Sequence, residues 1–155
     1  MYDALKVAQW FIVRNEFEKA SGDGEDLSLL KLLKLLYYAE GCSLALDNGS
    51  LFEDNIIAWE HGPVVPSVYH HYNADPFHLP CDEEAEDAAR EIAPKDAQIL
   101  EMVYNVFGQY SAWGLRNMTH QEKPWKDATH NGEVLNGIID RQTMKEYFKK
   151  NYIEQ

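Results

Sequence analysis

The stretch of sequence that decides the fold is Leu27-Ser28-Leu29-Leu30-Lys31-Leu32-Leu33-Lys34-Leu35-Leu36-Tyr37-Tyr38. Seven of its first ten residues are leucine, and at 100° per residue these leucines occupy most directions around a helix. A helix that is apolar nearly all round is buried inside a protein. We therefore predict a central helix over residues 28–46, capped by Ser28, with the side chains of Leu33 and Leu36 almost free of solvent contact.

One narrow stripe of this helix carries side chains of other kinds: Lys31, Lys34, Tyr38 and Cys42. Lysines at the edge of a buried helix usually lay their alkyl chains along the apolar surface and place the ammonium in solvent. The alternative is an ion pair in a surface groove, with Glu60 or Glu122 as the candidate carboxylates. We favour the solvated arrangement, because most lysines of this kind gain little from ion pairing.

The overall composition indicates one globular domain over residues 1–155. The hydrophobic fraction is 45%, which is typical of a folded protein. With 14 Lys and Arg against 26 Asp and Glu, the chain has a net charge of −12. Because this charge repels phosphate groups, we expect neither nucleic acid nor an anionic membrane as a partner, and a basic protein fits better.

The sequence predicts a cytoplasmic location. The chain does not begin with a basic segment followed by an apolar one, as a secretory signal does. The apolar stretch over residues 27–38 is too short to span a bilayer and is interrupted by lysines. The two cysteines, Cys42 and Cys81, form no CxxC pair and indicate no disulfide framework.

Further helices are expected around the central one. Hydrophobic spacing and capping residues place them over 3–18, 66–72, 97–107, 111–118 and after Asp140, with Asp3, Asp96, Ser111 and Asp140 as N-caps. We expect a short solvated helix or a loop over 82–91, and a strand over 55–59 whose candidate partner is 134–139. The predicted fold is mainly α: a single globular helical domain around the leucine-rich helix, with at most a small β element.

The segment Trp59-Glu60-His61-Gly62-Pro63-Val64-Val65-Pro66 follows the expected strand. Pro63 fixes its own φ and restricts the residue before it, and Gly62 is free to take a positive φ. We predict that Gly62-Pro63 forms a turn after the strand and directs Trp59 and His61 toward a third segment, Thr119-His120-Gln121-Glu122-Lys123-Pro124-Trp125.

The sequence contains none of the common catalytic or nucleotide-binding patterns, such as GxGxxG, GxxxxGK[ST], GxSxG or HExxH. The one candidate acid–base group is His61, His120 and Glu122, which could supply a base and the residue that orients it. The structural interpretation is a polar network in which His120 and Glu122 tie a turn to the backbone with Trp125 packed over it. We favour this interpretation and assign no catalytic residue and no cofactor.

A second group of histidines, together with one cysteine, is a candidate metal site. His70, His71, His78 and Cys81 fall within twelve residues. Their spacing matches no standard zinc pattern, and adjacent histidines on a helix point in different directions. We interpret them as exposed side chains and assign no metal ligand.

Together, three segments resemble the Panacea domain family, which comprises SocA-like antitoxins and GepA-type phage-associated proteins. The segments are the KLLKLLYY helix, the segment ending in GPV, and the THQEKPW box, and the resemblance extends from about Ala4 to Phe148. Its motif positions are Lys31, Lys34, Tyr37, Tyr38, Trp59, His61, Gly62, Pro63, Val64, Thr119, His120, Glu122, Pro124 and Trp125. Leu33 and His61 depart from the residues that the family often carries, a glutamine and a tyrosine respectively.

The resemblance implies an α-helical antitoxin without enzymatic activity. Family members neutralise protein toxins encoded beside them, typically by direct binding, and at least one branch delivers its toxin to a protease. Many are found in prophages or mobile elements. An acidic chain fits a basic toxin as partner, and the resemblance leaves the oligomeric state open. The alternatives are a phage-associated accessory protein and an enzyme that uses His61, His120 and Glu122.

Overall fold

The leucine-rich stretch forms helix α2 (Leu29–Ala45) at the centre of the computed structural model, which describes residues 1–154. Fourteen of its 17 residues are buried, and the Ser28 hydroxyl caps it by accepting a hydrogen bond from the Lys31 amide. Leu33 is 3% exposed and Leu36 is 0% exposed. The prediction of a buried central helix is therefore confirmed.

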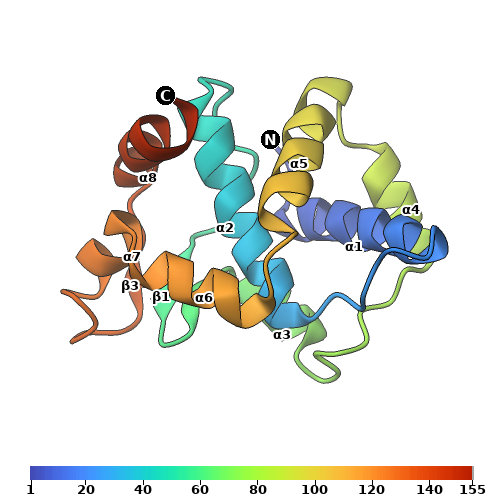
Figure 1. Cartoon of the computed structure of the whole chain (residues 1–155), viewed down its shortest axis with the longest axis horizontal. Helices are drawn as coiled ribbons and strands as arrows, with labels where there is room; N and C mark the ends of the chain where they lie inside the picture. Colours follow the sequence, from blue (N-terminus) through green and yellow to red (C-terminus); the bar gives the residue numbers. More distant parts are fainter. Residues whose placement is uncertain (155) are drawn as a thin grey trace.

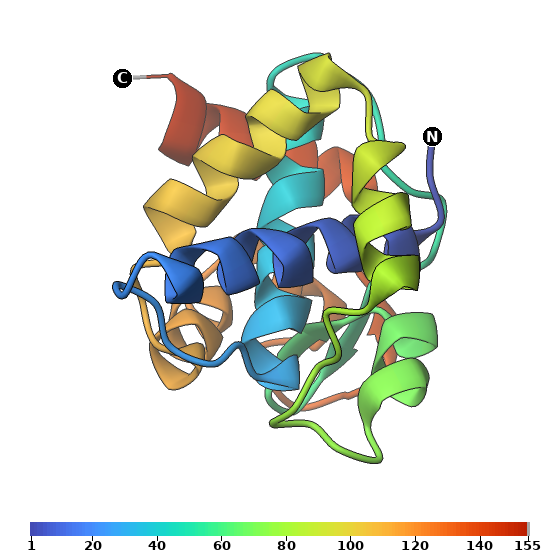
Figure 2. The same cartoon turned by 90° about the vertical axis from the view of Figure 1, so that its right-hand side faces the viewer.

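The other elements surround α2, as Figure 1 shows, with α1 and α4 on one side and α7 and α8 on the other. Figure 2 shows α1 lying across α2, with α4 packed crosswise on α1 near its N-terminal end. The helices are α1 (Ala4–Ala20), α3 (Pro66–Tyr72), α4 (Glu83–Arg90), α5 (Pro94–Phe107), α6 (Ala112–His120), α7 (Lys123–Ala128), α8 (Arg141–Phe148) and a terminal π-helix, η1 (Lys149–Ile153). The mainly α architecture is as predicted, and no helix in residues 1–154 has the length and hydropathy to cross a membrane.

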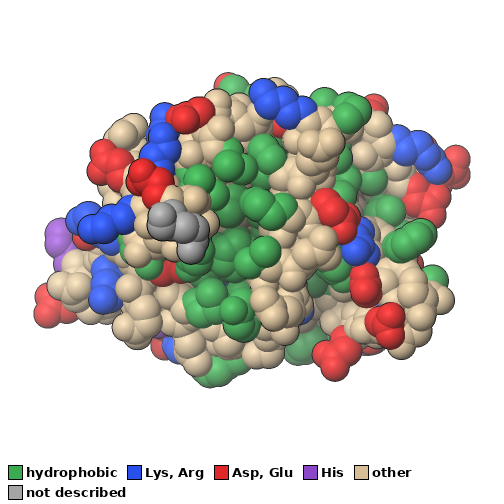
Figure 3. Space-filling view, turned by 45° about the horizontal axis from the view of Figure 1, so that its top comes forward, with side chains coloured by type: hydrophobic (Ala, Val, Ile, Leu, Met, Phe, Trp, Pro, Cys, Tyr) green, Lys and Arg blue, Asp and Glu red, His purple; other side chains and the backbone are tan. Residues whose placement is uncertain are grey.

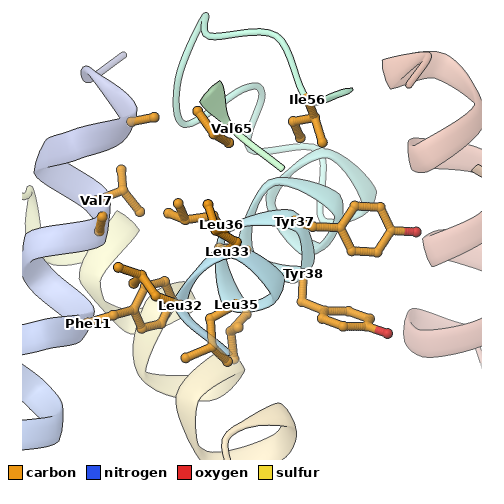
Figure 4. Packing of buried hydrophobic residues seen from close by; sticks show 14 of the residues in the cluster. Val7, Phe11, Leu32, Leu33, Leu35, Leu36, Tyr37, Tyr38, Ile56 and Val65 are labelled. Atoms are coloured by element: carbon orange, nitrogen blue, oxygen red, sulfur yellow. The ribbon is translucent and has the colours of Figure 1, made fainter. Parts of the chain in front are cut away.

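The leucines and the tyrosines of α2 face different partners. In Figure 4 the leucines lie toward Val7 and Phe11 of α1, whereas the hydroxyls of Tyr37 and Tyr38 point the other way, toward the C-terminal helices. One side of α2 is therefore packed by aliphatic groups, and the other brings two phenol oxygens into the interior.

A small sheet lies beside α2, with the strand order β2-β1-β3. The strands are β1 (Ile57–Trp59), β2 (Gly62–Val64) and β3 (Gly137–Ile138), and β1 is antiparallel to both neighbours. The predicted pairing of β1 with the 134–139 segment is confirmed. The predicted turn at Gly62-Pro63 is wrong, because the chain reverses at Glu60-His61 and Gly62-Pro63 begins β2. An edge strand tolerates a proline, which cannot donate to the ladder.

One expected N-cap, Asp96, is wrong, and a second, Asp3, forms no capping hydrogen bond. Helix α5 begins at Pro94 with Ala93 at the N-cap position, and Asp96 accepts hydrogen bonds from Tyr2 Oη (2.6 Å) and Asn48 Nδ2 (2.8 Å). Asp3 occupies the N-cap position of α1, as predicted, but its side chain makes no capping bond, and the Ala4 amide donates to Asp54 at 3.0 Å. Backbone amides at the starts of these helices donate to side chains from distant parts of the chain, Asp54 and Tyr2. Sequence spacing does not reveal such contacts.

Hydrophobic side chains also reach the surface. Figure 3 views the face that includes α5 and the C-terminal helices, where hydrophobic side chains gather in the middle and charged ones lie toward the rim. Exposed residues of α5 and of the turn after it include Val106 and Tyr110. An acidic protein therefore also presents apolar area to potential partners.

Helix α2 contains a glycine that its packing requires. A β-carbon at Gly41 would overlap the ring of Phe148, which is buried among other aromatic side chains. We expect Gly41→Ala to lower the free energy of unfolding by about 1–3 kcal/mol, because overpacking outweighs the helix-propensity gain of about 1 kcal/mol. Urea denaturation measures this loss. In a Phe148→Leu background the cost should shrink, and an unchanged cost there would contradict the steric explanation.

Candidate functional site

The three motif segments meet on one side of α2. The structure places Lys31, Lys34, Tyr37 and Tyr38 on α2, Trp59 on β1, His61 in the hairpin turn, Gly62, Pro63 and Val64 on β2, Thr119 and His120 at the end of α6, and Glu122, Pro124 and Trp125 at the start of α7. The predicted meeting of the hairpin with the 119–125 box is confirmed by a hydrogen bond from Trp125 Nε1 to Trp59 O, at 3.0 Å.

The first contact between the segments is made by Lys34 of α2, which binds the backbone of β2. Lys34 is 0% exposed, and its ammonium donates to Pro63 O at 2.7 Å. Gly62 has a φ of 105°, and a β-carbon there would lie 2.7 Å from Lys34 Cε and 2.8 Å from Thr119 Oγ1. Lys34, Gly62 and Thr119, one residue from each segment, therefore meet at this point. Only glycine fits at position 62, because its φ is positive and because a side chain would overlap Lys34 and Thr119.

The expected solvation of the α2 lysines is wrong. Lys34 is buried, and Lys31 is half-buried with its ammonium donating to Gly108 O at 2.6 Å. Neither lysine forms an ion pair with Glu60 or Glu122, so the alternative is wrong as well. The ammonium groups bind backbone carbonyls, which the hydrophobic pattern alone does not indicate. Burial lowers the pKa of Lys34 to about 7, and the charge of Arg116 acts in the same direction.

A buried carboxylate forms the second contact. Glu122 is 2% exposed and accepts hydrogen bonds from Tyr37 Oη (2.9 Å), Tyr38 Oη (3.1 Å) and the hydroxyl of Tyr152 on η1. Burial raises the pKa of Glu122 to about 7, although the three hydroxyls favour the charged form. The predicted bond from this side chain to the backbone is therefore wrong. No pattern in the sequence pointed to Tyr152 as a partner.

The stacking of His120 on Trp125 forms the third contact. Their ring centroids are 4.0 Å apart at an interplanar angle of 11°. Trp125 thus packs on this box, as predicted, but the stacking on the His120 ring was not predicted. The Nε2 atom of His120 is buried and makes no hydrogen bond to any described residue. Burial, followed by the charge of Arg116, lowers the pKa of His120. The ring therefore serves as a packing surface and leaves one polar atom unused.

The three residues of the acid–base alternative do not form a hydrogen-bonded group. His61 is exposed in the hairpin turn, and its Nδ1 atom lies 3.3 Å from Nε of Arg116. Glu122 is buried, and its carboxylate accepts hydrogen bonds from Tyr37, Tyr38 and Tyr152. No hydrogen bond joins any two of His61, His120 and Glu122 among residues 1–154. A base and an orienting residue need such a bond, so this geometry does not favour proton transfer.

A cleft of about 430 Å³ opens beside the motif contacts. We call it the hairpin cleft, and its lining residues are Leu29, Leu30, Leu33, Lys34, Trp59, Glu60, His61, Val64, Tyr69, Pro76, Leu135 and Asn136. Most of these are apolar or aromatic, as in sites that bind organic groups. Sequence patterns did not reveal this cleft, because its walls come from five separate parts of the chain.

The other histidines have ordinary neighbours. His70 and His71 lie beside Tyr69 and Tyr72, and His78 contacts Asp75 at 2.9 Å. Within residues 1–154, no three His, Cys, Asp or Glu side chains are grouped so that they could hold a metal ion. The exposed ring of His78 has a raised pKa because of its hydrogen bond to Asp75.

Comparison with known proteins identifies the family. The model of the family described as "Antitoxin SocA-like, Panacea domain" matches residues 32–126. This range is well over half of the 155 residues and contains nearly all the motif positions, from Lys34 to Trp125. No curated protein and no solved structure matches the chain. The shared motif segments, which meet around α2, and the family match together establish that the chain belongs to the SocA-like antitoxin family of the Panacea domain.

Proposed function

We propose that the protein neutralises a protein toxin encoded beside it by binding that toxin directly in the cytoplasm. Family membership carries this proposal. The motif side chains support it, because Lys34, Glu122 and Trp125 are engaged in buried contacts that hold the fold together. Because these side chains are buried, we expect the toxin to bind exposed residues on the surface around them.

A basic toxin is the partner that charge favours. At −12 the chain attracts a positively charged protein over a distance of about 8–10 Å at physiological salt. Such attraction raises the association rate more than the final affinity. Delivery of the bound toxin to a protease is a further step that the same binding would permit.

Co-expression with the neighbouring gene product tests the proposal. The wild-type protein is expected to restore growth and to co-purify with the toxin, because binding occupies the toxin. A folded His120→Phe/Glu122→Gln variant, which keeps the stack and the volume of the carboxylate, should also restore growth. The measurements are colony formation, co-purification and the circular dichroism spectrum of the variant.

Three outcomes separate the alternatives. If the folded variant binds the toxin but no longer restores growth, the enzyme becomes the better explanation. If no neighbouring product is toxic or binds, the antitoxin role is wrong. If a complex forms but its association rate does not fall between about 50 and 300 mM salt, the partner is not attracted by charge.

A further inference from the structure

Two cations beside the hairpin cleft lack the ion pairs that most others have. Within residues 1–154, eight of the 14 lysines and arginines contact a carboxylate: Lys6, Arg14, Lys19, Arg90, Lys123, Arg141, Lys145 and Lys149. Lys34 and Arg116 form no ion pair within residues 1–154, although acidic side chains outnumber basic ones. Arg116 lies near Lys34, since its charge acts on that ammonium and Thr119 Oγ1 donates to its carbonyl at 2.7 Å.

Two histidines lie beside these cations, and we define the polar cluster as Lys34, His61, Arg116 and His120. Arg116 reaches His61 at 3.3 Å, and its guanidinium lies 4.4 Å from the ring centroid of Trp113. The cluster has unused donors: the Lys34 ammonium carries three N–H groups and has one hydrogen-bond acceptor, Pro63 O. The positive charges of Lys34 and Arg116 repel each other, and an incoming carboxylate would offset that repulsion.

The cluster adjoins the apolar walls of the hairpin cleft. Lys34 and His61 belong to both, and the facing walls are formed by Leu30, Trp59 and Leu135. His61 is exposed and lines the cleft, and the half-buried Arg116 lies beside it, with Nε donating to His61 and Nη1 to Asn117; the remaining N–H groups of both stay available, whereas Lys34 lies beneath the hairpin. The site therefore offers an apolar recess next to the positive charges of Lys34 and Arg116, and its lining also includes the exposed carboxylate of Glu60.

We propose that the hairpin cleft docks a segment of the partner protein in which a large apolar side chain lies next to an aspartate or glutamate. The apolar group fills the recess, and the carboxylate binds His61 and Arg116 at the mouth, with the charge of Lys34 behind them. The identity of the partner as the toxin rests on the proposed function. Long-range attraction to a basic toxin is compatible with this contact, because a single acidic residue can set the docking register locally.

Random heptapeptides displayed on phage, selected against the immobilised wild-type protein, provide the test. Selected sequences are expected to carry Asp or Glu within two positions of Trp, Phe or Leu. In fluorescence anisotropy, Arg116→Gln and Leu135→Asp should each weaken binding of a selected peptide by about tenfold or more, as should Glu→Gln in the peptide itself. Lys95→Gln is the matched control and should leave the affinity unchanged. Lys95 is exposed, lies on α5 and has no ion pair among the residues that the structure describes.

Opposite results would overturn the proposal. A consensus without an acidic residue, no consensus at all, or full binding by the folded variants each rejects the site. Leu135 is 41% exposed, so its replacement is informative even if Arg116→Gln disturbs the fold. In co-expression, rescue by wild type and equally by both variants rejects the site and leaves the antitoxin role intact. An acidic consensus that binds the cleft, without any rescue by wild type, rejects the antitoxin role alone.

Discussion

Replacing Leu36 by alanine is expected to lower the free energy of unfolding by about 2–5 kcal/mol. Leu36 is 0% exposed and lies on the face of α2 that packs toward α1, where Val7 and Phe11 supply the facing surface. The substitution removes apolar contact and leaves a cavity that these helices can close only in part. Urea denaturation, followed by circular dichroism at 222 nm, measures the change.

Leu46→Ala is the matched control for this experiment. Leu46 follows the last residue of the same helix and is 41% exposed, so removal of the same atoms creates no internal cavity. Its cost should stay within about 1 kcal/mol. If the two variants lose similar amounts of stability, α2 is not the centre of the core.

Glu122→Gln is expected to change how stability depends on pH. The pKa of Glu122 is raised to about 7 in the folded protein, against an ordinary value of 4.5. The folded state therefore holds this proton more tightly than the unfolded state. Its stabilising contribution is complete below pH 4.5 and is lost as pH rises through 7. Between pH 5 and pH 8 the wild type should lose about 2–3 kcal/mol relative to the glutamine variant.

The measurement is the difference between two denaturation series, so other titrating groups contribute equally to both. Glutamine keeps the volume of the side chain and an oxygen that accepts from Tyr37, Tyr38 or Tyr152. Glu133→Gln, at an exposed site in the loop before β3, is the control and should follow the wild type. A constant difference between wild type and Glu122→Gln across this pH range would mean that Glu122 remains ionised in the folded protein.

The hydrophobic pattern predicted the central features of the fold because they depend on local spacing. Leucines in most directions around one helix can be satisfied only by burial, and Leu33 and Leu36 are buried as predicted. The β-branched segment that contains β1 pairs with the 134–139 region, as expected. The second partner, β2, was missed, because Gly62-Pro63 has the character of a turn and becomes a strand only at the edge of this sheet.

The sequence by itself determined a mainly α fold, a buried leucine helix and membership of the family, because periodicity and motif residues are local properties of the chain. Tertiary structure alone decided what the polar residues do. Lys34 and Glu122 have side chains long enough to reach solvent or several partners, and their spacing does not choose among these. The packing of the hairpin and of η1 against α2 made that choice, placing Pro63 O at the ammonium and Tyr152 at the carboxylate. The same packing left Arg116 beside His61 of the hairpin cleft, with no ion pair to any carboxylate within residues 1–154.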